Sequence, residues 1–219
     1  MPKGSEELAS ARKEEIINAC AELYETMGFK DITIRDIGAR TSFTRTSIYN
    51  YFQTKEEIFL ALLQREHRAW ITDLEAVMQT YTSLSVDGFA DMVAHTLEKR
   101  ECMLKLISMN LYDMEGNSRM ENLVEFKQVY GGSIQAVASC IERFFPAMAD
   151  GAVRQFLYAF FPFLFGVYPY TMPTVKQREA MELAQVEYAS YTIYEITRNF
   201  VARMLCAFLE GTQEPSEKD

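Results

Sequence analysis

A short run of polar side chains near the N-terminus has the chemistry to contact a nucleic acid. Residues 44–47 read Thr-Arg-Thr-Ser, and residues 49–51 read Tyr-Asn-Tyr. Hydroxyl, amide and guanidinium groups donate hydrogen bonds to phosphate oxygens, and Arg and Asn also pair with base edges in the major groove. No acidic residue interrupts this run. The run therefore predicts a surface that faces DNA, provided that its neighbours hold it on the outside of a fold.

Three helices are expected to position this run. Apolar residues spaced four and three apart predict a first helix over about 10–27, ended by Gly28 in a left-handed conformation. Thr33 with Asp36 forms a capping-box pattern that opens the second helix, and after a turn over 41–43 a third begins at Thr44. Two helices joined by such a turn form a helix-turn-helix, whose second helix enters the major groove. The alternative is a plain helical bundle with a polar face, which does not explain hydroxyls and an arginine without an acid at the helix start.

The rest of the chain also follows helical periodicity, with no strand-like alternation. Thr54 with Glu57 predicts a capped fourth helix that runs to about Tyr81. Further helices are expected over about 86–109, and from Ser118, which Glu121 would cap, to Pro146. A helix after Asp150 would be disturbed at Pro162. A short helix follows Thr174, with Gln177 as its capping partner, and the last helix is expected over 188–209. Gly131-Gly132 predicts a kink or a close packing point.

These elements predict an all-α protein with a small and a larger domain. We expect a helix-turn-helix domain over 8–55, a helical effector-binding and dimerisation domain over 56–211, and a polar tail over 212–219.

Composition narrows the class of protein. The 219 residues are 48% hydrophobic and 24% charged, as in an ordinary globular protein, and the net charge is −9. Between residues 33 and 55 four basic residues stand against one acid, so a local basic patch can dock on phosphate from an acidic body. The longest apolar stretch, 156–170, contains two prolines and is too short to span a bilayer. With no secretory signal at the N-terminus, we expect a cytoplasmic protein without a membrane partner.

The sequence also lacks the patterns of a catalytic or metal site. The four cysteines are far apart, no CxxC pair occurs, and neither histidine has a neighbour at ligand spacing. No GxSxG, HExxH or P-loop motif occurs. We therefore expect no enzyme, no metal and no cofactor, and four separate thiols in a reducing compartment.

Over residues 23–58 the sequence resembles the TetR/AcrR family of bacterial transcriptional regulators. The residues that carry the resemblance are Gly28-Phe29, Thr33-Ile34, Ile37-Gly38, Thr44, Ile48-Tyr49-Asn50-Tyr51-Phe52 and Lys55-Glu56. Two positions depart from the family pattern. Thr41-Ser42 replaces Ala-Gly in the turn, where a non-glycine residue predicts mild strain, and Thr46 replaces a frequent glycine.

The resemblance implies roles for individual residues. The base-reading residues would be Arg45, Thr46 and Asn50, and the phosphate anchors would be Thr33, Thr44, Ser47, Tyr49, Tyr51 and Lys55. It further implies a repressor that binds a palindromic double-stranded operator as a homodimer and is released by a small apolar or aromatic ligand. A DNA-binding architectural factor with a protein partner in place of the ligand is the alternative.

Beyond residue 85 the resemblance implies an architecture, and the apolar residues supply candidate sites. The candidate ligand-pocket residues are Phe89, His95, Met103, Asn110, Tyr130, Phe160 and Tyr168. The candidate dimer-interface residues are Phe156, Phe163, Tyr194, Val201, Leu205 and Phe208. For each set the alternative is that these side chains fill the core of a single chain.

Overall fold

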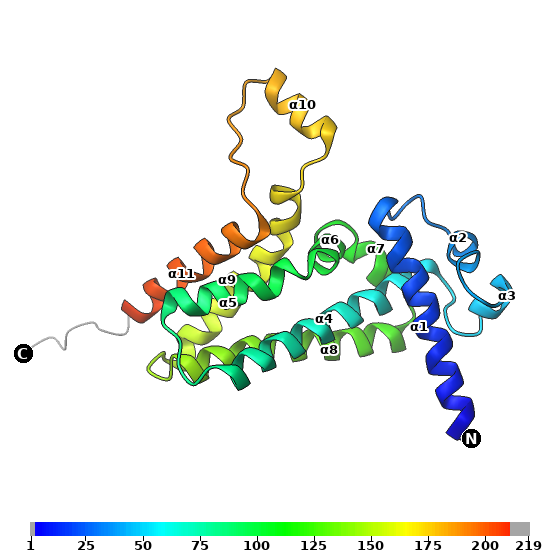
Figure 1. Ribbon diagram of the computed structural model, residues 1–219, viewed down its shortest axis with the longest axis horizontal. Coiled ribbons are helices and arrows are strands. Elements are labelled where there is room, and N and C mark those ends of the chain that lie inside the picture. Colours follow the sequence, from blue (N-terminus) through cyan, green and yellow to red (C-terminus); the bar gives the residue numbers. More distant parts are fainter. Residues whose placement is uncertain (1–2, 211–219) are drawn as a thin grey trace, which may run out of the picture. The chain divides into compact units, whose positions relative to one another are not determined.

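The computed structural model describes residues 3–210, apart from the side chains of residues 3–5 and of Arg45. Within this range the secondary structure is entirely helical, so the predicted all-α fold is confirmed (Figure 1). The helices are α1 (Lys3–Thr26), α2 (Ile34–Gly38), α3 (Arg45–Ile48), α4 (Lys55–Thr80), α5 (Val86–Glu98), α6 (Glu101–Met109), α7 (Leu111–Gly116), α8 (Met120–Phe144), α9 (Asp150–Thr171), α10 (Val175–Leu183) and α11 (Ile193–Glu210). None of them combines the length and the apolar character that crossing a bilayer requires.

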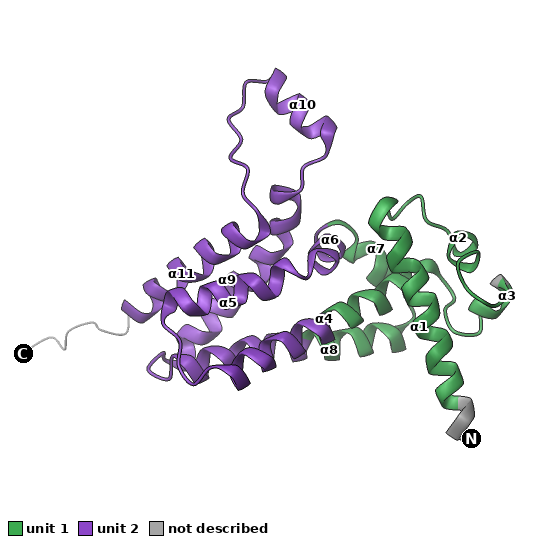
Figure 2. Cartoon of the chain, in the orientation of Figure 1, with its two compact units in different colours: residues 1–66, 109–130 green, residues 67–108, 131–219 purple. Residues whose placement is uncertain are grey.

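The chain divides into two compact units (Figure 2). Unit 1 comprises residues 1–66 and 109–130, and unit 2 comprises residues 67–108 and 131–219. Helices α4 and α8 belong to both units, because each begins in unit 1 and ends in unit 2, and α6 passes from unit 2 into unit 1 at its last residue, Met109. The expected tail over 212–219 lies outside the described residues.

Unit 1 has a small core that gathers α1, α2, α3 and the first turns of α4. Ile16, Ile37 and Ile48 are fully buried, one from each of the first three helices. The ring of Phe59 on α4 contacts Tyr24 at 5.2 Å and Phe29 at 4.7 Å between centroids. Burying these apolar side chains, at about 25 cal/mol per Å² of apolar area, is what holds α2 and α3, which are short, against α1 and α4.

Unit 2 is built around Trp70, which is fully buried on α4. Its indole nitrogen donates to the Thr96 hydroxyl on α5 at 3.0 Å, and its ring lies 6.4 Å from that of Phe160 on α9. The last helix, α11, packs against α5 and α9. On α8, a Cβ at Gly132 would lie 3.4 Å from Ile71, so this glycine is a close packing point between α8 and α4, as predicted.

Helix boundaries were predicted correctly where the capping side chains act locally. Thr33 with Asp36 and Thr174 with Gln177 form complete capping boxes at the starts of α2 and α10. At α4 the box is half formed. The Glu57 amide donates to the Thr54 hydroxyl, but the Glu57 carboxylate accepts from the Gln53 amide instead of the Thr54 amide.

Two predicted helix starts are wrong, because the hydroxyl groups near them make hydrogen bonds that the sequence pattern did not indicate. The Ser118 hydroxyl donates to the Met114 carbonyl at the end of α7, so α8 starts at Met120 rather than at Ser118. The last helix starts at Ile193 instead of 188, because Thr192 caps it. The Thr192 hydroxyl accepts from the Glu195 amide, and the Glu195 carboxylate accepts from the amide and the hydroxyl of Thr192.

Other local predictions also change. The expected helix over 86–109 is two helices, separated at Lys99 and Arg100, where the Arg100 guanidinium pairs with Asp73 at 2.5 Å. Helix α9 continues through Pro162 without interruption. Gly28 does not take the left-handed conformation; its carbonyl instead accepts from Asp31 and Ile32 in a turn.

Candidate nucleic-acid interface

The helix-turn-helix of unit 1 is formed by α2, the residues 39–44 and α3. At the start of α2, the Thr33 hydroxyl accepts from the Asp36 amide at 3.3 Å and donates to its carboxylate at 2.6 Å. These hydrogen bonds from Thr33 lower the pKa of Asp36 below its usual value. The cap fixes the first turn of α2 and therefore the direction in which the chain enters the turn.

The turn between α2 and α3 is held by its own hydroxyl groups and by α1. The Thr41 hydroxyl donates to the Gly38 carbonyl at 3.0 Å, and the Ser42 hydroxyl donates to the Glu15 carboxylate at 3.0 Å. The Ser42 amide donates to the same carboxylate. Among the described non-glycine residues only Gln185 has a positive φ, so the predicted strain in this turn is absent. Glu15 could not be predicted from the local pattern, because its partner Ser42 lies 27 residues away.

Helix α3 and the residues on either side of it, 44–52, present polar side chains outward and apolar ones inward. Ile48 and Phe52 are buried, whereas Thr44, Thr46 and Asn50 are exposed. Tyr49 is 46% exposed, and Ser47 and Tyr51 are partly exposed. The Thr44 hydroxyl pairs with that of Ser47 at 3.1 Å and makes no cap bond to the backbone. The side chain of Arg45, a predicted base reader, is not among those described.

The side chain of Lys55, a predicted phosphate anchor, makes hydrogen bonds to the backbone of unit 1. Its ammonium group donates to the carbonyls of Phe29 at 2.7 Å and Ile32 at 3.0 Å, and lies 4.6 Å from the centre of the Phe29 ring. An ammonium has three N–H donors, so one donor and the positive charge stay available after these two bonds. Lys55 therefore ties the loop before α2 to the start of α4.

Comparison with known proteins assigns the family. The profile for the Tetracyclin repressor-like C-terminal domain matches residues 64–214, which is more than half of the chain, and the profile for bacterial regulatory proteins of the tetR family matches residues 16–62. The chain belongs to the TetR family of transcriptional regulators. Family and fold are those of DNA-binding regulators, not of enzymes.

Individual relatives of this TetR-family chain are distant. The uncharacterized HTH-type transcriptional regulator YfiR of Bacillus subtilis is 25% identical over 183 residues, which cover 72% of this chain and 85% of YfiR. The fatty acid degradation regulator FadR of Bacillus halodurans has a similar structure, with a TM-score of 0.58 at 14% identity over 89% of this chain and 94% of that one. FadR of Bacillus subtilis, solved in complex with stearoyl-CoA, gives a TM-score of 0.56 at 15% identity, over 88% of this chain and 96% of that one. These likenesses concern the fold.

The predicted pocket residues of this TetR-family chain are divided between its units. Asn110 and Tyr130 belong to unit 1, where the Asn110 amide oxygen accepts from Tyr24 at 2.9 Å and Tyr130 packs on Phe126. The members in unit 2 are Phe89, His95, Met103, Phe160 and Tyr168. Phe89, Met103 and Phe160 are fully buried in the core of that unit.

The two remaining members lie closer to solvent. Tyr168 is half-buried, and burial, with Glu101 and Cys102 nearby, raises the pKa of its hydroxyl. His95 is exposed and stacks on Tyr194 with centroids 4.7 Å apart. It lines an open groove of about 480 Å³ between α4 and α5. The groove is lined by Asp73, Ala76, Val77, Thr80, Tyr81, Met92, His95, Thr96 and Lys99.

The predicted dimer residues separate into core and surface. Phe156, Val201 and Leu205 are buried within the chain itself, so they have almost no area left for a partner. Phe163, Tyr194 and Phe208 keep part of their surface, and the Tyr194 hydroxyl donates to Asp91 at 2.5 Å. The rings of Phe163 and Phe200 stack 4.0 Å apart where α9 meets α11. A surface groove of about 300 Å³ lies there, lined by Phe163, Tyr191, Ile196, Asn199, Phe200 and Arg203.

Proposed function

We propose that the chain is a repressor that binds a palindromic operator as a homodimer and is released by a small apolar or aromatic ligand. The observation that carries the proposal is the exposed polar face of α3, held by the buried Ile48 and Phe52 and by a turn without strain. A helix with this exposure, preceded by a capped helix and a short turn, has the geometry that enters the major groove. The acidic remainder of the chain favours approach to DNA through this one face.

The residues of the helix-turn-helix divide into two roles in this proposal. Arg45, Thr46 and Asn50 read base edges, with Asn50 suited to adenine and Arg45 to guanine. Thr33, Thr44, Ser47, Tyr49 and Tyr51 hold phosphates. Lys55 contributes mainly by fixing the Phe29–Ile32 loop, with its remaining donor facing the backbone of the duplex.

Two substitutions and one control test this division. Asn50→Ala is expected to lower affinity for a selected operator by about 1–3 kcal/mol and to relax preference at one base pair of each half-site. Tyr49→Phe is expected to weaken selected and random duplexes by similar factors. Lys176→Ala, on the exposed α10, is the matched control and should change neither. An Asn50→Ala protein with unchanged base preference would contradict the assigned reading face.

For the homodimer we propose the surface formed by α9 and α11 around Phe163 and Phe200. It is apolar and grooved, and Tyr158 on α9 is 82% exposed. Two copies of a helix pair form a four-helix interface with two-fold symmetry, which matches a palindromic site. Phe163→Arg should yield a monomer in sedimentation at micromolar concentration, whereas Tyr112→Arg, on the exposed surface of unit 1, should stay dimeric. A dimeric Phe163→Arg protein would exclude this surface.

For the ligand we propose a site in unit 2 that includes the α4–α5 groove. Helix α4 begins beside the helix-turn-helix and ends in this groove, at a length of about 39 Å for 1.5 Å per residue. A ligand that favours one position of α4 changes operator affinity by about 5- to 150-fold. A thermal-shift screen of apolar and aromatic compounds, with stearoyl-CoA included because one neighbour was solved with it, supplies candidates for operator titration. Ligands that stabilise the protein but leave operator affinity unchanged would exclude this mechanism.

A further inference from the structure

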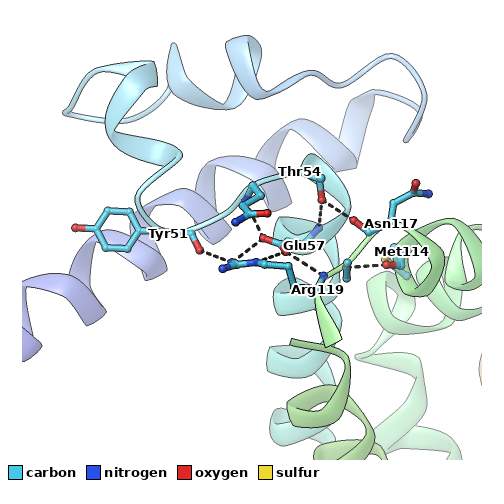
Figure 3. Close-up of polar contacts among 8 residues, drawn as sticks. Tyr51, Thr54, Glu57, Met114, Asn117 and Arg119 are labelled. Atoms are coloured by element: carbon cyan, nitrogen blue, oxygen red, sulfur yellow. Dashed lines mark hydrogen bonds and ion pairs between the residues drawn. The ribbon is translucent and has the colours of Figure 1, made fainter. Parts of the chain in front are cut away.

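An ion pair in unit 1, with a buried carboxylate and a partly exposed guanidinium, joins α4 to the residue that precedes α8 (Figure 3). The side chain of Glu57, in the first turn of α4, is fully buried. Its carboxylate accepts from the Arg119 guanidinium at 2.6 Å and 2.9 Å, and from the Arg119 amide at 3.1 Å. These two residues are 62 positions apart in the sequence.

The same pair holds the end of the helix-turn-helix. The Glu57 carboxylate also accepts from the Gln53 amide at 2.7 Å, and the Arg119 guanidinium donates to the Tyr51 carbonyl at 3.3 Å. Tyr51 and Gln53 lie in the segment between α3 and α4, so a change at Arg119 acts on the segment that also carries Asn50. We propose that Arg119 is a positioning residue that sets the orientation of α3 on the operator.

Hydrogen bonds keep the Glu57 carboxyl charged in the interior. Burial by itself raises the pKa of this carboxyl, but the hydrogen bonds from Arg119 and Gln53 outweigh burial and the pKa is lowered. A buried carboxylate that loses its partner is strongly destabilised, so the pair has one preferred arrangement. Arg is suited to this position because its planar guanidinium contacts both carboxylate oxygens and the Tyr51 carbonyl together.

Helix α8 connects this pair to unit 2 through the chain itself. Residues 120–130 of α8 belong to unit 1 and residues 131–144 to unit 2, without a break in the helix. Within unit 1, two more bonds join α4 and the residue before it to the start of α8 and the end of α7. The Thr54 hydroxyl donates to the Asn117 carbonyl at 3.0 Å, and the Gln64 amide donates to the Asn122 carbonyl at 3.3 Å. Arg119 therefore stands at the start of a helix that runs, like α4, from unit 1 into unit 2.

This inference rests on the proposed operator binding, and Arg119→Lys is the variant that tests it. Lysine keeps the charge but cannot contact both carboxylate oxygens and the Tyr51 carbonyl in one plane. We expect affinity for the selected operator to fall about tenfold or more, within the range typical of coupled sites, while affinity for random duplex changes less. Arg178→Lys, on the exposed α10, is the matched control and should behave as wild type.

Hydrogen exchange of the amides of residues 51–53 gives a second measurement on DNA-free protein. Exchange should be faster in Arg119→Lys and in Glu57→Gln than in wild type, while the amides of α9 exchange as before. If Arg119→Lys lowers only the melting temperature and the folded protein binds operator as wild type does, the positioning role is overturned and the proposed function stands. If wild type itself selects no operator, the proposed function and this inference both fail.

Discussion

The burial of His67 makes a quantitative prediction about stability and pH. This side chain, in the part of α4 that belongs to unit 2, is 1% exposed, and burial lowers its pKa from 6.5 to about 4. The folded protein thus keeps His67 neutral between these two values, whereas the unfolded chain takes up a proton. Because the unfolded state binds more protons in this window, the free energy of unfolding is largest above pH 6.5 and falls as the pH drops towards 4.

The magnitude follows from the size of the shift. Each pKa unit corresponds to about 1.4 kcal/mol, so the full effect is about 3 kcal/mol, of which about 2 kcal/mol is lost between pH 7 and pH 5. Most carboxylates stay charged over this narrower range, so they contribute little to the change. Since domains are stable by about 5–15 kcal/mol, the loss is easily measured.

Urea unfolding at pH 7 and pH 5 is the assay, with the second histidine as the control. The chain contains two histidines, and His95 is exposed. The pH dependence should disappear in His67→Phe, whatever that substitution does to stability at pH 7, and should persist in His95→Gln. If His67→Phe loses as much stability between pH 7 and pH 5 as wild type does, the reasoning from burial is refuted.

Three other substitutions are expected to change the free energy of unfolding, two of them lowering it and one raising it. Lys55→Met should lower the free energy of unfolding by about 2–3 kcal/mol, because the carbonyls of Phe29 and Ile32 lose charge-assisted hydrogen bonds. An unchanged urea midpoint would contradict this. On α8, Gly131→Ala should raise stability by about 0.5–1 kcal/mol, because no heavy atom lies within 4 Å of the new Cβ and alanine favours the helix. Gly132→Val should lower it by about 1–3 kcal/mol through overpacking against Ile71, and equal melting temperatures for the two variants would show that the α4–α8 contact is not tight.

The sequence predicted those features that depend on neighbours along the chain. The capping boxes at Thr33 and Thr174 were predicted because both partners lie three residues apart. The prediction failed at Ser118, where the same local pattern was present but the hydroxyl bonds backwards to Met114.

Features that depend on distant partners could not be predicted in this way. Glu57 reads as a capping residue in the sequence, yet its carboxylate binds Arg119, 62 positions later. Lys55 reads as a surface cation, yet its amine holds two carbonyls. Aromatic residues of α9 and α11 give the same pattern whether they line a core or an interface, and only packing separates the buried Phe156 from the partly exposed Phe163.

Operator selection from a random duplex pool tests most directly whether α3 reads DNA in the proposed way. The wild-type protein should enrich a palindrome whose half-sites lie about one helical turn apart, and its affinity should fall steeply with salt as counterions are released. Asn50→Ala in the same selection should enrich sites with relaxed preference at one position of each half-site. Enrichment of no sequence by the wild-type protein, or of a single half-site without its inverted copy, would contradict the proposed dimeric operator binding.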